Sequence, residues 1–118
     1  MAGISAKRIL IVDDEPLVCE SLRLALGIDG HVSEVVYSAE EALAQFGLGK
    51  FDVVFIDFKM PGMKGDQLAR EIKTRDPAQT IILLTGSPPL PIPVDIAAVI
   101  LKPFDLELLR KTLAAVAA

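Results

Sequence analysis

Apolar residues gather in five short runs along the chain, each about the length of a strand and rich in β-branched side chains. The runs lie at residues 9–12, 32–36, 53–56, 81–84 and 99–101. Four of them are almost uninterrupted, which predicts strands covered on both faces, as in a parallel sheet between two layers of helices. In the remaining run, 32–36, polar residues break the pattern, and this favours a place at the edge of the sheet.

The segments between and after these runs carry apolar residues at helical spacing, together with start and stop signals. Four helices are expected, one after each of the first three runs and one after the last. The signals are Pro16 and Gly27, then Ser38 with Glu41 as in a capping box and Gly47, then Pro77, and finally Pro103 with Asp105. This alternation predicts an α/β fold with a doubly wound, five-stranded parallel sheet.

The segment between the fourth and fifth strands departs from the alternation. Ser87 to Pro93 contains four of the chain's eight prolines, which remove hydrogen-bond donors and restrict the residues before them. A regular helix is therefore not expected there. No repeat and no shift of composition divides the chain, so residues 1–118 are interpreted as a single domain.

Composition narrows the class of protein. With 52% hydrophobic residues and a mean hydropathy of +0.48, a chain of 118 residues can bury a core without disulfides or a structural metal. The net charge of −4 disfavours direct binding to nucleic acid, which requires clustered Lys and Arg. The longest apolar run, residues 96–101, is too short to span a bilayer, and no signal-peptide core is present. We therefore expect a cytoplasmic protein with no membrane association.

Two isolated side chains carry little functional weight. The single cysteine, Cys19, excludes an internal disulfide and is expected to be a small helix residue. His31 has no base or nucleophile near it in the sequence and is expected to have a surface or edge role.

Polar side chains follow four of the predicted strands at their carboxyl ends. They are Asp13 and Asp14, Asp57, Thr85, and Lys102. Because the carboxyl ends of parallel strands share one edge of a sheet, these residues are expected to meet where such folds bind ligands. Three carboxylates roughly 5 Å apart repel by about 3 kcal/mol per pair at an effective dielectric near 20. The ammonium of Lys102 offsets only part of this charge.

A divalent cation would neutralise the remaining charge. Ligation by oxygen alone favours Mg²⁺, which keeps water ligands and completes its shell on a phosphate. Asp13 and Asp14 are the expected metal ligands, and Asp57 is then free to react as a carboxylate nucleophile toward phosphorus. The residues thus predict phosphate chemistry at a metal site.

Four motifs contain these residues. They are Ile11-Val12-Asp13-Asp14-Glu15-Pro16, Asp57-Phe58-Lys59-Met60-Pro61-Gly62-Met63-Lys64-Gly65, Thr85-Gly86 and Lys102-Pro103-Phe104. Together they resemble the receiver domain of two-component response regulators and are similar to the single-domain chemotaxis regulators. The resemblance covers almost the whole chain. It implies a flavodoxin-like strand order of 2-1-3-4-5 and a phosphorylation-dependent signalling switch rather than an enzyme acting on external substrates.

The resemblance also implies how phosphate and metal are held. Asp57 accepts a phosphoryl group from the phosphohistidine of a histidine kinase or phosphotransfer protein. Mg²⁺ lies on Asp14, Asp57 and the backbone carbonyl of Lys59, with Asp13 helping through water. The side chains of Lys59 and Ser87 border the path of an attacking water and modulate the lifetime of the phosphate.

The remaining implied roles concern the switch. Thr85 and Lys102 hold the phosphoryl oxygens, Gly86 leaves the approach open, and the Lys102–Pro103 peptide bond is cis. Phosphorylated Asp57 carries a charge of about −2 and three acceptor oxygens, a local change that the Thr85 hydroxyl can follow. The signal then passes to an output partner that the sequence does not name.

Two departures from the family pattern bear on that output. The interval from Thr85 to Lys102 is short, which implies that the fourth helix of the family is missing or rebuilt as a Pro-rich loop. Val99 stands where the family commonly has a switching aromatic, so aromatic reorientation is not expected to carry the signal.

Two other functions remain as alternatives. One is a pseudo-receiver, an interaction module that keeps the fold without phosphotransfer. The other is a Mg²⁺-dependent phosphohydrolase, which often has a second aspartate two residues after its nucleophile, where this chain has Lys59. The sequence leaves open a homodimer, and also whether the chain is a fragment of a longer regulator.

Overall fold

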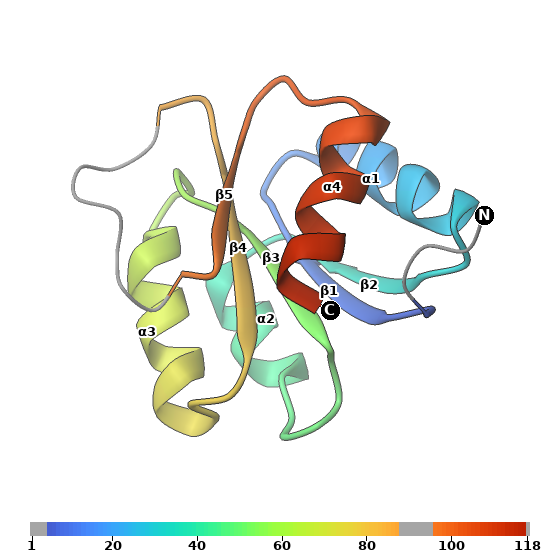
Figure 1. The fold of residues 1–118 in the computed structure, drawn as a ribbon. Coiled ribbons are helices and arrows are strands. Elements are labelled where there is room, and N and C mark those ends of the chain that lie inside the picture. Colours follow the sequence, from blue (N-terminus) through green and yellow to red (C-terminus); the bar gives the residue numbers. More distant parts are fainter. Residues whose placement is uncertain (1–4, 88–95, 118) are drawn as a thin grey trace.

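The computed structural model describes residues 5–87 and 96–117, which contain a five-stranded parallel sheet with the order β2-β1-β3-β4-β5 (Figure 1). The strands are β1 (Arg8–Val12), β2 (Val32–Val36), β3 (Val53–Asp57), β4 (Thr80–Thr85) and β5 (Ala98–Leu101). The helices are α1 (Pro16–Ile28), α2 (Ala39–Gln45), α3 (Gly65–Arg75) and α4 (Leu106–Ala117). The predicted α/β fold and its strand order are confirmed.

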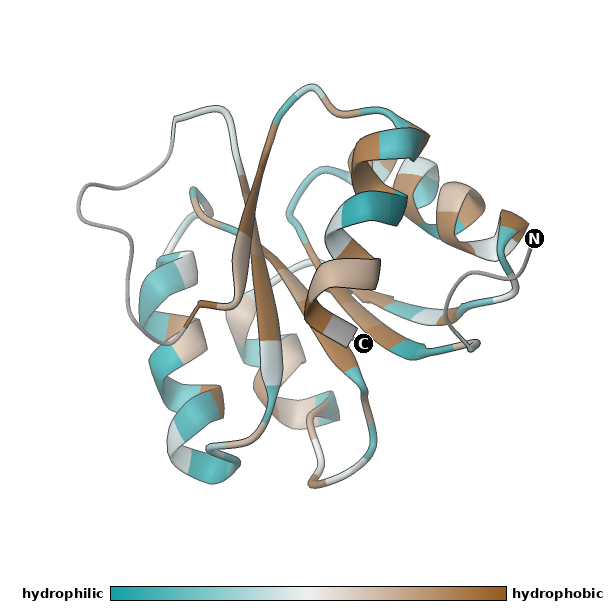
Figure 2. Cartoon of the chain, in the orientation of Figure 1, coloured by the Kyte–Doolittle hydropathy of each residue, from teal (hydrophilic) through white to brown (hydrophobic). Residues whose placement is uncertain are grey.

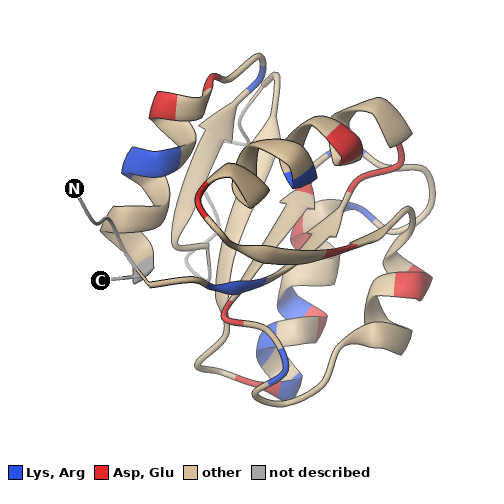
Figure 3. Cartoon of the chain, turned by 90° about the vertical axis from the view of Figure 1, so that its right-hand side faces the viewer, with Lys and Arg blue, Asp and Glu red and all other residues tan. Residues whose placement is uncertain are grey.

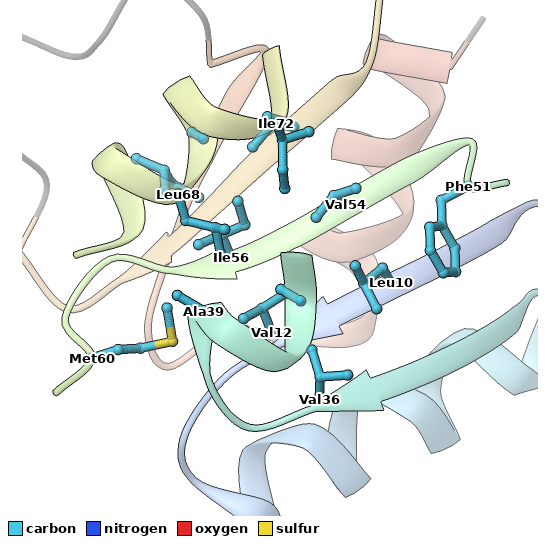
Figure 4. Packing of buried hydrophobic residues seen from close by; sticks show 14 residues of the cluster. Leu10, Val12, Val36, Ala39, Phe51, Val54, Ile56, Met60, Leu68 and Ile72 are labelled. Atoms are coloured by element: carbon cyan, nitrogen blue, oxygen red, sulfur yellow. The ribbon is translucent and has the colours of Figure 1, made fainter. Parts of the chain in front are cut away.

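Helices cover both faces of the sheet, with α1 and α4 on one face and α2 and α3 on the other (Figure 1). Successive strand residues point to opposite faces, so an uninterrupted apolar run feeds both layers. In β1, Ile9 and Ile11 pack toward α1 and α4, whereas Leu10 and Val12 pack toward α2 and α3. Figure 2 shows the hydrophobic colouring concentrated in the central strands, and Figure 4 shows the cluster under α2 and α3.

The helix ends follow the sequence signals with small differences. Helix α1 continues through the expected stop at Gly27 to Ile28. At the start of α2 the Ser38 hydroxyl accepts from the Glu41 amide at 3.1 Å, as predicted. The Glu41 carboxylate, however, accepts from the amide of Tyr37 rather than from that of Ser38. The carboxylate expected to cap α4 does so, since Asp105 Oδ1 accepts from the Leu108 amide at 2.8 Å.

Both edges of the sheet differ from its centre. Strand β2 is an edge strand, as predicted. Strand β5 forms the opposite edge. Its Ile100 is buried on one face and its Val99 is partly buried on the other, but Leu101 is 50% exposed, so the predicted cover on both faces is incomplete. The four helices of the described ranges include none between β4 and β5. The predicted Pro-rich loop falls almost wholly on residues 88–95, which lie outside the described residues.

His31 lies at the edge strand, as predicted, but it is only 7% exposed rather than on the surface. Its Nδ1 accepts from the backbone amide of Lys7 at 2.9 Å, which ties the chain before β1 to the start of β2. Burial lowers the pKa of the ring, and the accepting nitrogen requires the neutral form. Within the part of the chain that the structure describes, no helix has both the length and the apolar character to cross a membrane.

Candidate functional site at the carboxyl edge of the sheet

The two central strands end in neighbouring aspartates. In the parallel pairing of β1 with β3, Val12 lies opposite Ile56. Asp13 and Asp57 are the residues that come next along the two strand paths. Because side chains alternate along a strand, both aspartates project on the same side of the sheet. Asp13 is fully buried and Asp57 is 5% exposed. The register of the sheet therefore forces two carboxylates together at its edge.

All four polar groups of Asp13 are hydrogen-bonded. Its backbone amide donates to the Val36 carbonyl at 3.2 Å, and its carbonyl accepts from the thiol of Cys19 at 3.2 Å. Its Oδ1 accepts from the Glu15 amide at 2.9 Å, and its Oδ2 accepts from Lys102 Nζ at 3.0 Å. These hydrogen bonds hold both the backbone and the carboxylate of Asp13 in one position.

Lys102, directly after β5, bridges the two buried aspartates. Its Nζ lies 3.0 Å from Asp13 Oδ2 and 3.2 Å from Asp57 Oδ1, and its backbone amide donates to the Thr85 carbonyl at 2.8 Å. Burial alone would lower the pKa of the ammonium, but the hydrogen bonds and charges of the two carboxylates outweigh it and raise the pKa. Lys102 is therefore a fixed positive charge at neutral pH. The peptide bond between Lys102 and Pro103 is cis.

The pKa of Asp57 is raised above its ordinary value. Burial is the largest cause and the charge of Asp13 is the next, while the charge and hydrogen bond of Lys102 act in the opposite direction. Removing water from a carboxylate and placing it beside another carboxylate both disfavour ionisation. The single ammonium of Lys102 does not fully compensate this crowding.

The third carboxylate completes a cluster of oxygen atoms. Asp13, Asp14 and Asp57 each offer one oxygen, and these atoms lie within 4.8 Å of one another. Asp14 is exposed, so the cluster opens to solvent on its side. An all-oxygen set with one solvent-facing carboxylate fits Mg²⁺, which binds few protein carboxylates and keeps waters. Figure 3 shows that elsewhere Lys and Arg lie among Asp and Glu along the helices.

Thr85 ends β4 at the same edge and is 2% exposed. Its hydroxyl donates to the Ser87 carbonyl at 2.8 Å and accepts from the Ser87 amide at 3.1 Å. The Thr85 proton is thus already engaged within its own turn. Gly86 and Ser87 are exposed, and a Cβ on Gly86 would meet nothing within 4 Å. The space beside Gly86, next to Thr85, is therefore open. Lys59 is exposed in the segment that follows β3.

Three residues near the site were given no role there by the sequence. Glu15 fixes Asp13 through its amide, and its carboxylate lies 4.0 Å from Lys102 Nζ. Cys19 donates to the Asp13 carbonyl, and burial, followed by the charge of Asp13, raises the pKa of the thiol to about 11. Gly65 lies so close to the Asp57 backbone that an added Cβ would be 2.5 Å from the Asp57 carbonyl oxygen. The sequence predicted only that Cys19 is a small helix residue, and its hydrogen-bond partner follows from tertiary packing alone.

Comparison with known proteins places the chain in a family. A model of the response regulator receiver domain matches residues 9–114. The chain belongs to this family. The receiver is 38% identical over 79 residues to the two-component response regulator PhoP of Pseudomonas aeruginosa, covering 67% of this chain and 35% of PhoP. It is 33% identical over 110 residues to the transcriptional regulatory protein ZraR of Salmonella typhimurium, covering 89% of this chain and 25% of ZraR. The chain therefore spans about a quarter to a third of these two relatives.

Solved structures extend the similarity to almost the whole receiver. The chemotaxis protein CheY4 of Vibrio cholerae gives a TM-score of 0.87 at 26% identity and covers 95% of this chain and 99% of its own. The response regulator protein TrrA of Thermotoga maritima, in complex with Mg²⁺-BeF, gives 0.82 at 34% identity, covering 91% and 96%. A complex of TrrA with the histidine kinase ThkA gives 0.84 at 32% identity, covering 95% and 99%.

Proposed function

We propose that this receiver accepts a phosphoryl group on Asp57 from the phosphohistidine of a histidine kinase or phosphotransfer protein. The observation that carries the proposal is the contact of Asp57, at a sheet edge open to solvent, with the Lys102 ammonium and two further carboxylates. The complex of ThkA with TrrA supports a kinase as the partner of such a fold. We further propose that residues 1–118 act as a single receiver domain in the cytoplasm.

The chemistry follows from the charges. An oxygen of the Asp57 carboxylate attacks phosphorus in line with the leaving imidazole, and the new P–O bond replaces the P–N bond. The phosphohistidine ring carries a proton on its other nitrogen, so the electron pair of the P–N bond stays on the leaving nitrogen and the ring departs as neutral imidazole. Such a transfer needs positioning and charge neutralisation more than covalent help. Lys102, already 3.2 Å from Asp57 Oδ1, neutralises the phosphoryl oxygens as they arrive. Asp13, Asp14, Asp57 and the Lys59 carbonyl would hold Mg²⁺, which supplies further neutralisation when bound.

Phosphorylation changes the partner of the Thr85 hydroxyl. The phosphoryl group offers charged acceptor oxygens, which make stronger hydrogen bonds than the neutral carbonyl of Ser87. When the Thr85 hydroxyl donates to phosphate, the bond to Ser87 that is present in this structure is broken. Gly86 and Ser87 then move, and an output partner recognises the change. Val99 is too small to add the reorientation of an aromatic ring to this signal.

The receiver offers an apolar surface beside the site to the partner that delivers the phosphoryl group. A hollow of about 420 Å³ lies between the start of α1 and the segment after β5. Its lining residues are Leu17, Val18, Ser21, Lys102, Pro103 and Phe104. An apolar side chain seated there would bring the histidine of the partner next to the Lys102 end of the site.

The test is direct phosphorylation with acetyl phosphate and Mg²⁺. We expect the intact protein to gain the mass of one phosphoryl group, which base removes and acid preserves, and peptide mapping to place it on Asp57. Asp57→Asn should gain nothing. Asp52→Asn is the matched control, because Asp52 lies just before the same strand and pairs with Arg8 far from the cluster.

The same experiment separates the alternatives. A pseudo-receiver would take up no phosphate although it is folded, and would overturn the proposal. A phosphohydrolase would release phosphate from a phosphomonoester over many turnovers. We expect no such turnover, because exposed Lys59 occupies the place of the second aspartate in those enzymes.

A further inference from the structure

Gly65, the first residue of α3, makes the closest backbone approach to the phosphoacceptor. A Cβ atom on Gly65 would lie 2.5 Å from the carbonyl oxygen of Asp57 and 2.7 Å from the Cα atom of Phe58. Real Cβ atoms essentially never come this close to other atoms. The φ angle of Gly65 is not in the left-handed region, unlike that of Gly62 at +78°. Glycine is therefore required at position 65 for space and not for conformation.

The atoms that Gly65 approaches belong to the peptide group that follows the phosphoacceptor. The Phe58 amide at one side of this peptide donates to the Leu84 carbonyl at 2.9 Å. The Asp57 carbonyl at the other side lies against Gly65. The Gly65 amide also donates to the Phe58 carbonyl at 2.9 Å, which closes the segment that contains Lys59. Strand β4 and helix α3 thus hold this peptide between them.

Neither neighbour can retreat easily from a side chain at position 65. The contacting atoms are backbone, so no flexible side chain can turn away. Helix α3 is anchored in the core by Leu68 and Ile72, which pack beside Val54 and Ile56 of β3 (Figure 4). A methyl group at position 65 must therefore displace the end of β3 or the segment after it.

We propose that Gly65 is a positioning residue for the phosphoacceptor site: its lack of a side chain lets α3 fix both the Asp57 carboxylate and the Lys59 carbonyl. The proposal rests on the proposed function, because it concerns how accurately the same site is held. It predicts a loss of metal affinity and phosphorylation rate that exceeds what a general loss of stability would cause.

The test compares Gly65→Ala with Gly62→Ala. Gly62 lies in the same segment, its positive φ makes alanine strained, and a Cβ there would meet nothing within 4 Å. Both variants lose stability, but only Gly65→Ala presses on the peptide of Asp57. Binding of Mn²⁺, used in place of Mg²⁺, is measured by electron paramagnetic resonance at a temperature where circular dichroism shows both variants folded. Phosphorylation by acetyl phosphate is measured under the same conditions.

We expect Gly65→Ala to weaken Mn²⁺ binding by about tenfold, as when a group that orients a metal ligand is lost, and to slow phosphorylation. Gly62→Ala should keep wild-type affinity. Equal affinities in the two variants would overturn the positioning role. If Gly65→Ala alone does not fold, it is tested together with Gly27→Ala, which removes a helix glycine where a Cβ meets nothing within 4 Å. If the double variant also does not fold, Gly65 is needed for folding itself, and the proposal is overturned as well.

The wild-type protein and Asp14→Ala separate this proposal from the proposed function. Phosphorylation of the wild type, with Mn²⁺ binding that Asp14→Ala removes, supports the function whatever Gly65→Ala does. A wild type that neither binds Mn²⁺ at the cluster nor takes up phosphate contradicts the function, and the positioning role fails with it.

Discussion

Replacing Asp57 by asparagine should stabilise the metal-free protein. The amide keeps the shape of the side chain and can still accept from Lys102, but it removes one charge from the crowded cluster. Because the pKa of Asp57 is raised in the folded state, ionising this carboxyl opposes folding. The cost is present at neutral pH and disappears as the pH falls toward the ordinary carboxyl pKa of about 3.9, where the folded carboxyl is protonated.

The magnitude follows from the distances. Two charges 4.8 Å apart, the widest separation in the cluster, repel by about 3.5 kcal/mol at an effective dielectric of 20. Asp57 meets two such charges, while Lys102 at 3.2 Å attracts it by about 5 kcal/mol on the same scale. The remainder is about 2 kcal/mol of net repulsion, and solvent around exposed Asp14 reduces it toward roughly 1 kcal/mol. For a domain of this size, that corresponds to a rise of the melting temperature by about 4 °C.

The assay is thermal and urea unfolding of both proteins at pH 7.5 with a chelator, repeated with Mg²⁺. The advantage of Asp57→Asn should shrink with Mg²⁺, because the ion relieves the same repulsion in the wild type. Asp29→Asn is a control that should lower the stability, because Asp29 pairs with Arg110 and this pairing lowers the pKa of the carboxyl. A metal-free Asp57→Asn protein that melts below the wild type would refute the idea of a crowded site.

Three further changes test other parts of the structure. Mg²⁺ should raise the melting temperature of the wild type by mass action, and Asp14→Ala should remove most of this effect; an equal response in both proteins would put the ion elsewhere. His31→Asn keeps an acceptor for the Lys7 amide but does not titrate. Because the pKa of His31 is lowered in the folded state, the wild type should lose more stability than this variant as the pH falls below about 6.5, and parallel urea midpoints from pH 8 to pH 5 would contradict that. Lys59→Ala should change the rate at which phosphorylated Asp57 is hydrolysed, measured by loss of the phosphoryl mass, and an unchanged rate would show that the Lys59 side chain points away.

The fold was predictable because the apolar runs report burial directly. The longer runs without polar interruption, such as that of β3, do lie under helices on both sides. The carboxylate cluster was predictable for a related reason, since parallel strands that end in aspartate must bring these side chains to one edge. The exposure of β5 was not predictable from its short run, because an edge strand and a covered strand of this length share the same composition.

The contacts that hold the site could not be predicted. The bond from Cys19 to the Asp13 carbonyl depends on how α1 lies over the sheet, and one thiol in a helix does not specify its acceptor. The approach of Gly65 to Asp57 depends on the angle at which α3 meets β3. The sequence contains a glycine at position 65, but a glycine needed for conformation and one needed for space look alike until backbone distances are known.

Asp57 ends β3 and Asp13 directly follows β1, and this has a consequence for local unfolding. Strand β3 is buried along its whole length and β1 is buried from Ile9 onward, so their amides are expected to exchange with solvent only when the whole domain opens. Exposed Asp14 and Lys59, in contrast, lie outside the strands, in segments that are expected to open more easily. The two buried carboxylates therefore cannot relieve their repulsion by local fraying. Short of global unfolding, only a proton or a cation can do so, and this makes the most protected part of the domain the part most sensitive to its ligands.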